Sequence, residues 1–135
     1  MDNVINAARS LGKIIQQDDR YTRYMKAQEA NEQDSALQQL IEKFHETRID
    51  LNAESGKPEK DMERVKELDA QVKNLYKDIF ANPNMVELSD ARNDMEYLLN
   101  FVNQIVTGSS NGQDPEAIQY AESCGGSCSS CSGCN

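Results

Sequence analysis

The chain has 135 residues, of which 38% are hydrophobic and 27% charged, and its formal net charge is −9. This length suits one domain with a modest core, and a sequence without Trp and with only three Pro favours long helices over a strand-rich protein. Because affinity for phosphate comes chiefly from Lys and Arg, we expect a chain this acidic not to bind nucleic acid directly.

The N-terminal stretch MDNVINAARSLGKII lacks the basic region and apolar core that mark a signal peptide. No stretch of the sequence approaches the roughly 18 apolar residues of a membrane span. We therefore expect a cytoplasmic protein with no membrane insertion. In that reducing compartment, cysteines favour metal binding over disulfides.

Two short amphipathic helices are predicted first. Apolar residues recur at intervals of three and four through residues 2–17, which predicts one helix. Asp18 can cap the second, over residues 18–30. This second helix carries a basic group that is either a solvated face or a contact surface. Its members are Arg20, Arg23 and Lys26.

Two long helices follow, separated by the stretch SGKP. Asn31 as N-cap, with Asp34 in the first turn, predicts a helix over residues 31–54. Gly56 can end this helix in a left-handed conformation, and Pro58 can open the next. Two long helices joined by so short a break predict an antiparallel hairpin.

A third long helix is predicted over residues 83–106, with Asn82 as cap and Pro83 at the first helical position. With the hairpin and the shorter N-terminal helices, it predicts an all-α helical bundle. A heptad-like seam on this helix favours a homodimer, unless the seam is used inside one monomer. The seam consists of Leu88, Ala91, Met95, Leu98, Val102 and Ile105.

The composition changes after Val106, so we place a helical domain over residues 1–107. The stretch TGSSNGQD predicts a flexible linker over residues 108–114. Residues 115–135 then hold a short helix, with Asp114 as cap and Pro115 at its start, and a cysteine-rich tail.

All four cysteines lie within the stretch CGGSCSSCSGC, as Cys124, Cys128, Cys131 and Cys134. The Gly and Ser residues between them let the backbone fold tightly around one metal centre. Spacings of two and three residues are typical of a 4Fe-4S cluster, whereas four-Cys zinc sites often pair two C-x2-C units across a longer loop. We predict these four as ligands of a 4Fe-4S cluster, with zinc as the alternative. A tail without metal or with an adventitious disulfide remains open.

The rest of the sequence shows no active-site pattern. The single histidine, His45, is predicted to be a partly exposed structural residue, because no Ser or Cys nucleophile pattern surrounds it. There is no phosphate-binding glycine loop, no HExxH and no GxSxG motif. We therefore expect that the protein is not an enzyme.

Three stretches together resemble a known family. They are AQEANEQDSALQQLIEKFHETRIDLN, SGKP and FANPNMVELSDARNDMEYLLNFVNQIV, and their most specific elements are Ala30 to Asp34, the Gly56 turn and the Asn82-Pro83 break. Over residues 3–107 the chain resembles the YlbF/YmcA family of small helical bacterial regulators. Its cysteine tail is similar to that of the YlbF branch, where the tail contributes to iron–sulfur binding.

The resemblance implies a non-enzymatic regulatory adaptor that forms dimers or larger assemblies. It implies a complex with YmcA-like and YaaT-like partners that acts as a specificity factor for the endoribonuclease RNase Y. Through mRNA processing, that complex would influence competence, sporulation and biofilm formation. The resemblance also gives Cys124, Cys128, Cys131 and Cys134 as the cluster ligands, and it supplies no catalytic residue.

Two other functions also fit the residues. One is a redox- or metal-sensing helical module, in which oxidation of the tail releases a partner. The other is a structural helical oligomer whose tail is dispensable.

Overall fold

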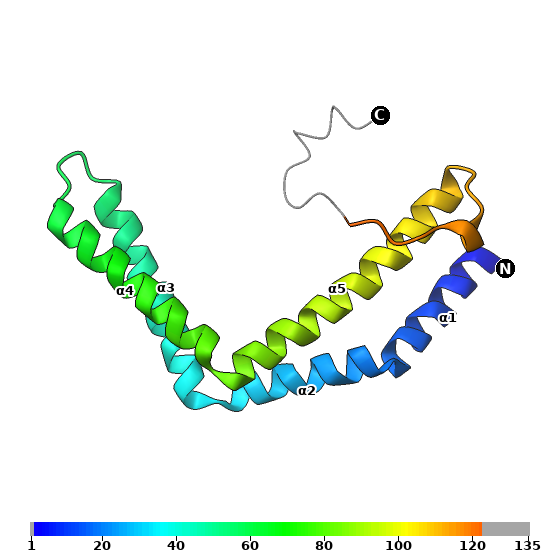
Figure 1. Cartoon of the computed structure of the whole chain (residues 1–135), viewed down its shortest axis with the longest axis horizontal. Coiled ribbons are helices and arrows are strands. Elements are labelled where there is room, and N and C mark those ends of the chain that lie inside the picture. Colours follow the sequence, from blue (N-terminus) through cyan, green and yellow to red (C-terminus); the bar gives the residue numbers. More distant parts are fainter. Residues whose placement is uncertain (1, 123–135) are drawn as a thin grey trace. The chain divides into compact units, whose positions relative to one another are not determined.

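The structure is a computed structural model that describes residues 2–122. All of its regular elements are helices, which confirms the predicted all-α class (Figure 1). The chain divides into two compact units, residues 1–95 and 96–135. The elements are α1 (Asn3–Gln17), α2 (Asp19–Gln33), α3 (Ser35–Ser55), α4 (Met62–Ala81), α5 (Pro83–Ser110) and a short 3-10 helix (Pro115–Ala117).

Each of the first four helices begins after an aspartate. The carboxylate of this aspartate accepts hydrogen bonds from one or two backbone N–H groups of the first turn at 2.9–3.3 Å. These N–H groups have no hydrogen-bond partner inside the helix, so the aspartate satisfies them. At the start of α5, Oδ1 of Asn82 accepts the N–H of Asn84 at 2.8 Å, and Pro83 takes the first helical position. The predicted roles of Asp18, Asn82 and Pro83 are confirmed. The four aspartates are Asp2, Asp18, Asp34 and Asp61.

The prediction that Asn31 caps the third helix is wrong. Asn31 lies inside α2, and Asp34 is the cap of α3, because its Oδ1 accepts the N–H of Leu37 at 3.0 Å. The side chain of Asn31 is buried, and its Oδ1 accepts a hydrogen bond from Nε2 of Gln38 at 2.9 Å. Asn31 therefore joins α2 to α3 from within α2.

A buried carboxylate organises the loop between α3 and α4. Gly56 follows the last residue of α3, as predicted, but its φ of −84° is right-handed rather than left-handed. The prediction for Pro58 is wrong, since α4 begins only after its cap, Asp61. Glu54 is 6% exposed, and its carboxylate accepts Nζ of Lys57 at 2.8 Å and the N–H of Asp61 at 3.1 Å. These two hydrogen bonds bring the ends of the loop together and lower the pKa of Glu54.

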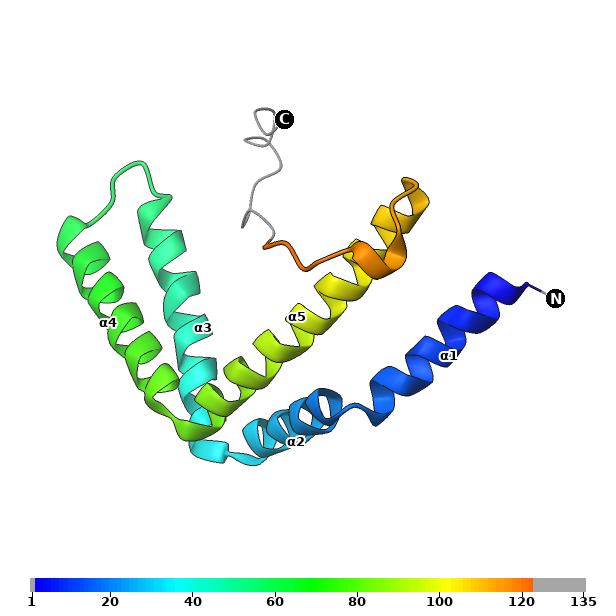
Figure 2. The ribbon, with the colours of Figure 1, turned by 45° about the vertical axis from the view of Figure 1, so that its right-hand side comes forward.

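The predicted hairpin is confirmed, because α3 and α4 lie side by side and antiparallel (Figures 1 and 2). Leu37, Leu68 and Ile79 supply its buried apolar side chains, and Leu37 is fully buried. Thr47 is also buried, and its hydroxyl donates to the carbonyl oxygen of Lys43 at 2.7 Å. A polar side chain is thus tolerated at this buried position because its hydroxyl is hydrogen-bonded within its own helix.

Within the first unit, the beginning of α5 packs on α2. Ala27, Leu88 and Ala91 form a buried cluster, and Tyr24 packs against it. Leu88 and Ala91 are 7% and 0% exposed, so this part of the predicted seam is used inside the monomer. The later seam residues are half-buried: Met95, Leu98, Val102 and Ile105.

A polar network connects the α2–α3 junction with the α4–α5 junction. Oδ2 of Asp34 accepts hydrogen bonds from Nδ2 of Asn82 and from Nδ2 of Asn84, each at 3.0 Å, while its Oδ1 caps α3. The N–H of Leu37 and the amides of Asn84 and Asn82 hold the pKa of Asp34 below its usual range. One ionised carboxylate therefore holds both junctions.

We expect Asp34→Asn to lower the free energy of unfolding at about pH 7 and to have less effect in acid. A carboxylate whose pKa is lowered by folding contributes stability above its unfolded pKa of about 3.9, and this contribution is lost as the pH falls through the lower folded pKa. Urea unfolding followed by circular dichroism at several pH values measures the difference between wild type and variant.

Asp50→Asn, on an exposed position of the same helix, is the control for the loss of a charge. The difference between wild type and Asp34→Asn should shrink below about pH 4. A difference that is the same at neutral pH and in acid would contradict the role given to Asp34.

Candidate functional site

The four predicted metal ligands, Cys124, Cys128, Cys131 and Cys134, lie outside the described residues. In number and donor type, four thiolates fit an iron–sulfur cluster or zinc. The structure describes the chain that leads to them, up to Glu122. We call residues 111–122 the return segment, and it belongs to the second unit with the C-terminal part of α5.

The helix before the return segment is longer than predicted. We expected it to end at Val106, but α5 continues to Ser110, so residues 108–110 of the expected linker are helical. The hydroxyl of Ser109 donates to the carbonyl oxygen of Ile105, and that of Ser110 to the carbonyl oxygen of Thr107, each at 2.7 Å. These bonds within the helix accommodate serines that otherwise favour turns.

Gly112 ends the helix and turns the chain. Its φ is 87°, a left-handed conformation that favours glycine. The N–H of Gly112 donates to the carbonyl oxygen of Ser109 at 3.1 Å, and the N–H of Gln113 donates to that of Gly108 at 3.0 Å. This pair of bonds is the Schellman motif, which satisfies the last carbonyl groups of a helix.

A single 3-10 turn follows, over Pro115–Ala117. Asp114 caps it and Pro115 is its first residue, as predicted, but the helix is shorter than expected. Beyond it, Ile118 packs on the buried Gly108: a Cβ atom on Gly108 would lie 2.6 Å from Cδ1 of Ile118. The absence of a side chain at Gly108 thus makes room for the return segment.

Tyr120 anchors the return segment on two aromatic residues of α5. Its ring centroid lies 4.5 Å from that of Tyr97 and 5.9 Å from that of Phe101, in an edge-to-face arrangement with Phe101. Tyr97 and Phe101 are one helical turn apart, and their centroids are 6.2 Å apart. These distances are within the range in which aromatic pairs attract each other.

Gln104 pairs with the backbone of Ala121. Its Nε2 donates to the carbonyl oxygen of Ala121 at 2.6 Å, and its Oε1 accepts the N–H of Ala121 at 2.9 Å. The side-chain amide thus satisfies both backbone groups of one residue, as a neighbouring β-strand would. This pairing fixes the backbone three residues before Cys124.

The contacts of the return segment follow one stripe of α5, formed by Tyr97, Phe101, Gln104 and Gly108. Figures 1 and 2 show the segment running back along α5. The stripe adjoins the predicted seam, and apolar periodicity does not reveal it because neither Gln104 nor Gly108 is apolar. The available signal was Tyr97 and Phe101 one turn apart, with Tyr120 shortly beyond the helix.

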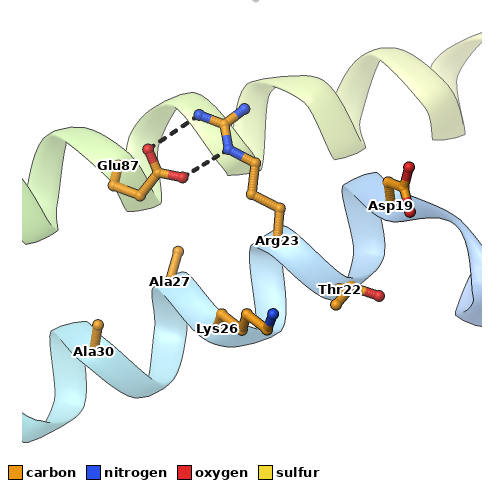
Figure 3. Close-up of a pocket in the computed structure, with 7 residues that line it drawn as sticks. All are labelled: Asp19, Thr22, Arg23, Lys26, Ala27, Ala30 and Glu87. Carbon is orange, nitrogen blue, oxygen red and sulfur yellow. Dashed lines mark hydrogen bonds and ion pairs between the residues drawn. The ribbon is translucent and has the colours of Figure 1, made fainter.

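The first unit has an open groove of about 460 Å³ between α2 and the beginning of α5 (Figure 3). Arg23 crosses it, and its Nε and Nη2 donate to the carboxylate of Glu87 at 2.6 and 3.1 Å. Its Nη1 donates to Asp94 at 2.7 Å. These bonds raise the pKa of Arg23 and lower that of Glu87. With Arg20 paired to Asp18, two of the three predicted basic residues are engaged within the chain.

A second groove, of about 280 Å³, is lined by apolar and aromatic side chains of α3 and α4 and by Met85. Phe44 is one of its lining residues, with the guanidinium of Arg48 5.7 Å from its ring centroid and the ring of His45 6.0 Å away. Tyr76 is 55% exposed. Aromatic, Met and Arg side chains are enriched in protein interfaces, so this groove has the composition of a protein-binding surface.

Within residues 2–122, no group of three or more His, Cys, Asp or Glu side chains could hold a metal ion. None of the helices described there is both long enough and apolar enough to cross a membrane.

Comparison with known proteins identifies one family. The family model described as control of competence regulator ComK, YlbF/YmcA, matches residues 4–109. The match covers the five α-helices almost completely and stops before the return segment. No curated protein and no solved structure matches the chain.

We expect the backbone amide of Ala121 to be protected from hydrogen exchange in the wild type and to lose that protection in Gln104→Leu. The substitution removes two hydrogen bonds, each worth about 1 kcal/mol, and a loss of 1.4 kcal/mol corresponds to roughly a tenfold change in an opening equilibrium. Exchange of the Ala121 amide, followed by NMR, measures the effect.

Asn103→Leu introduces the same side chain at the neighbouring exposed position of α5 and should leave this exchange rate unchanged. Equal exchange rates at Ala121 in wild type and Gln104→Leu would show that the pairing does not form in solution.

Proposed function

Because the chain belongs to the YlbF/YmcA family of competence regulators, we propose that it is a non-enzymatic regulatory adaptor of the YlbF kind. It assembles with YmcA-like and YaaT-like partners and modulates RNase Y-dependent mRNA processing and decay. Competence, sporulation and biofilm formation are influenced through this processing. The family match over residues 4–109 is the observation that carries the proposal.

Exposed apolar surface supports the adaptor role. Helix α1 has no buried residue, and Val4 and Ile14 on its apolar face are 76% and 62% exposed. The aromatic groove between α3 and α4 adds a second such surface. Contiguous exposed apolar surface marks binding sites for proteins, which supports assembly into a homodimer or a hetero-oligomer.

The donor set of the tail supports the proposed cofactor. We propose that Cys124, Cys128, Cys131 and Cys134 bind a 4Fe-4S cluster, which would hold the tail in one arrangement within the assembly. The return segment adds support, because it brings the backbone to a fixed place on α5 three residues before the first ligand.

Anaerobically purified protein should contain iron and acid-labile sulfide and show the visible absorbance of an iron–sulfur cluster. The double variant Cys128→Ser/Cys131→Ser should lose all three, because a cubane cluster needs its thiolate ligands. The matched control, Ser129→Ala/Ser130→Ala, changes two residues between these cysteines and should retain the cluster. One zinc per chain without iron would contradict the cluster.

In cells, a chain truncated after Glu122 should fail to support RNase Y-dependent processing, which mapping of transcript ends measures. This truncation retains the return segment, so it removes the ligands without disturbing the packing on α5. Co-purification with the YmcA-like and YaaT-like partners should be lost together with processing. Normal processing in cells that lack the whole chain would refute the adaptor proposal, and normal processing with the truncated chain would make the tail dispensable.

A further inference from the structure

The aromatic groove between α3 and α4, which Met85 also lines, has a fixed floor. Ile79 in this groove is 4% exposed and belongs to the buried side chains of the hairpin. The Sδ atom of Met85 accepts a hydrogen bond from Nδ2 of the buried Asn31 at 3.5 Å. The α4–α5 junction just before Met85 is held by Asp34. The groove is therefore formed before a partner binds, which lowers the cost of ordering side chains on binding.

Three aromatic rings form a continuous row in this groove. The ring centroid of Tyr76 lies 6.3 Å from that of Phe44 and 4.5 Å from that of Phe80. Tyr76 and Phe80 are one helical turn apart on α4, and they are 55% and 38% exposed. Aromatic rings supply a large contact area at a low cost in conformational entropy. The row therefore offers apolar side chains of a partner a rigid surface on which to pack.

Arg48 gives the groove a positive charge that no carboxylate of the groove balances. None of the residues that line the groove is acidic, and Arg48 forms no salt bridge with any residue from 2 to 122. Arg23 in the other groove differs, because Glu87 and Asp94 already bind its guanidinium. At physiological ionic strength, charges more than about 8 Å away are largely screened, so the net charge of −9 matters less here than Arg48. The groove thus favours an acidic group.

The groove is about as long as two turns of a helix. Ile41 and Arg48 line it and are seven residues apart on α3, which corresponds to about 10 Å along the helix axis. A bound amphipathic helix inserts apolar side chains at positions i, i+3 or i+4, and i+7, which also extend over two turns. The length of the groove therefore matches the apolar face of one helix.

We propose that the aromatic groove binds an amphipathic helix of a partner protein that carries an acidic side chain beside its apolar face. The apolar side chains of that helix pack on Tyr76 and Phe80, and its carboxylate pairs with Arg48. The existence of such a partner rests on the proposed function, whereas the chemistry of the partner follows from the exposed rings and from the guanidinium that has no carboxylate beside it.

The test measures binding of a fluorescein-labelled synthetic peptide to the full-length chain by fluorescence anisotropy. The peptide has about 18 residues, enough to form a helix in water, with Leu at intervals of three and four and Glu beside this stripe. A second peptide carries Gln in place of each Glu. Tyr76→Ala should weaken the binding of both peptides about tenfold, because aromatic anchors dominate the energy of protein interfaces. Tyr76 is largely exposed, so the circular dichroism of this variant should equal that of the wild type.

A double-mutant cycle measures the pairing of Arg48 with the Glu side chains. The ratio of the affinities for the Glu and Gln peptides should fall about fivefold in Arg48→Gln. Lys43→Gln removes a positive charge of α3 that lies outside the groove and should leave this ratio unchanged, and Leu99→Ala truncates an exposed side chain of α5 and should bind both peptides as the wild type does. The proposal would be overturned by absence of binding, by wild-type affinities in Tyr76→Ala, or by an unchanged ratio in Arg48→Gln.

A second arm uses the proposed partners themselves. The wild-type chain should retain the YmcA-like or the YaaT-like protein on co-purification, and Tyr76→Ala and Arg48→Glu should each lose at least one of them. Retention of neither protein by the wild type would refute the adaptor role, and the peptide arm would still decide the chemistry of the groove. Retention of both proteins by both variants would refute the groove alone. A wild-type dimer that dissociates in Tyr76→Ala, as measured by sedimentation, would place a second copy of the chain in the groove and overturn the proposal.

Discussion

The arrangement of the helix junctions in the first unit depends on the hydrogen bonds that the two carboxylate oxygens of Asp34 accept. One oxygen caps α3, and the other accepts the amides of Asn82 and Asn84, which are 48 and 50 residues away along the chain. Backbone N–H groups at a helix start need partners, and so do the amides of a tight junction, so one charge meets both requirements. With both junctions fixed, α3 and α4 close as a hairpin and α2 receives the start of α5.

The sequence predicted those features that are decided locally. Asp18, Pro83 and Asp114 mark helix starts correctly, because capping involves residues two or three positions apart. Prediction from the sequence failed where a residue far away along the chain determines which of two nearby residues caps a helix. Asp34 rather than Asn31 caps α3 because Asn82 and Asn84 bind it, and the loop after α3 depends on Glu54, whose partner Asp61 follows seven residues later.

The same limit applies to the site. The cysteines were evident as candidate ligands from residue type and spacing alone. The packing of the return segment on α5 was not predicted, because its first residues were predicted as a flexible linker and the following ones as a short helix. Its anchoring pair, Gln104 and Ala121, is separated by 17 residues and has no apolar periodicity. Two of the three most specific elements of the family resemblance, Ala30 to Asp34 and Asn82-Pro83, meet at the junction network. These two elements of the resemblance therefore lie where hydrogen bonds hold the two junctions together.

The aspartate caps also bear on the acidity of the protein. Five of the 23 acidic residues, Asp2, Asp18, Asp34, Asp61 and Asp114, each bind backbone N–H groups at a helix start. Their negative charge lies against the positive end of a helix dipole rather than being displayed only to solvent. Surface redesign that neutralises acidic side chains, for crystallisation or for a higher isoelectric point, should therefore spare these five. Glu54, Glu87 and Asp94 also bind groups within the chain, so charge is better exchanged at other exposed carboxylates, such as Asp50.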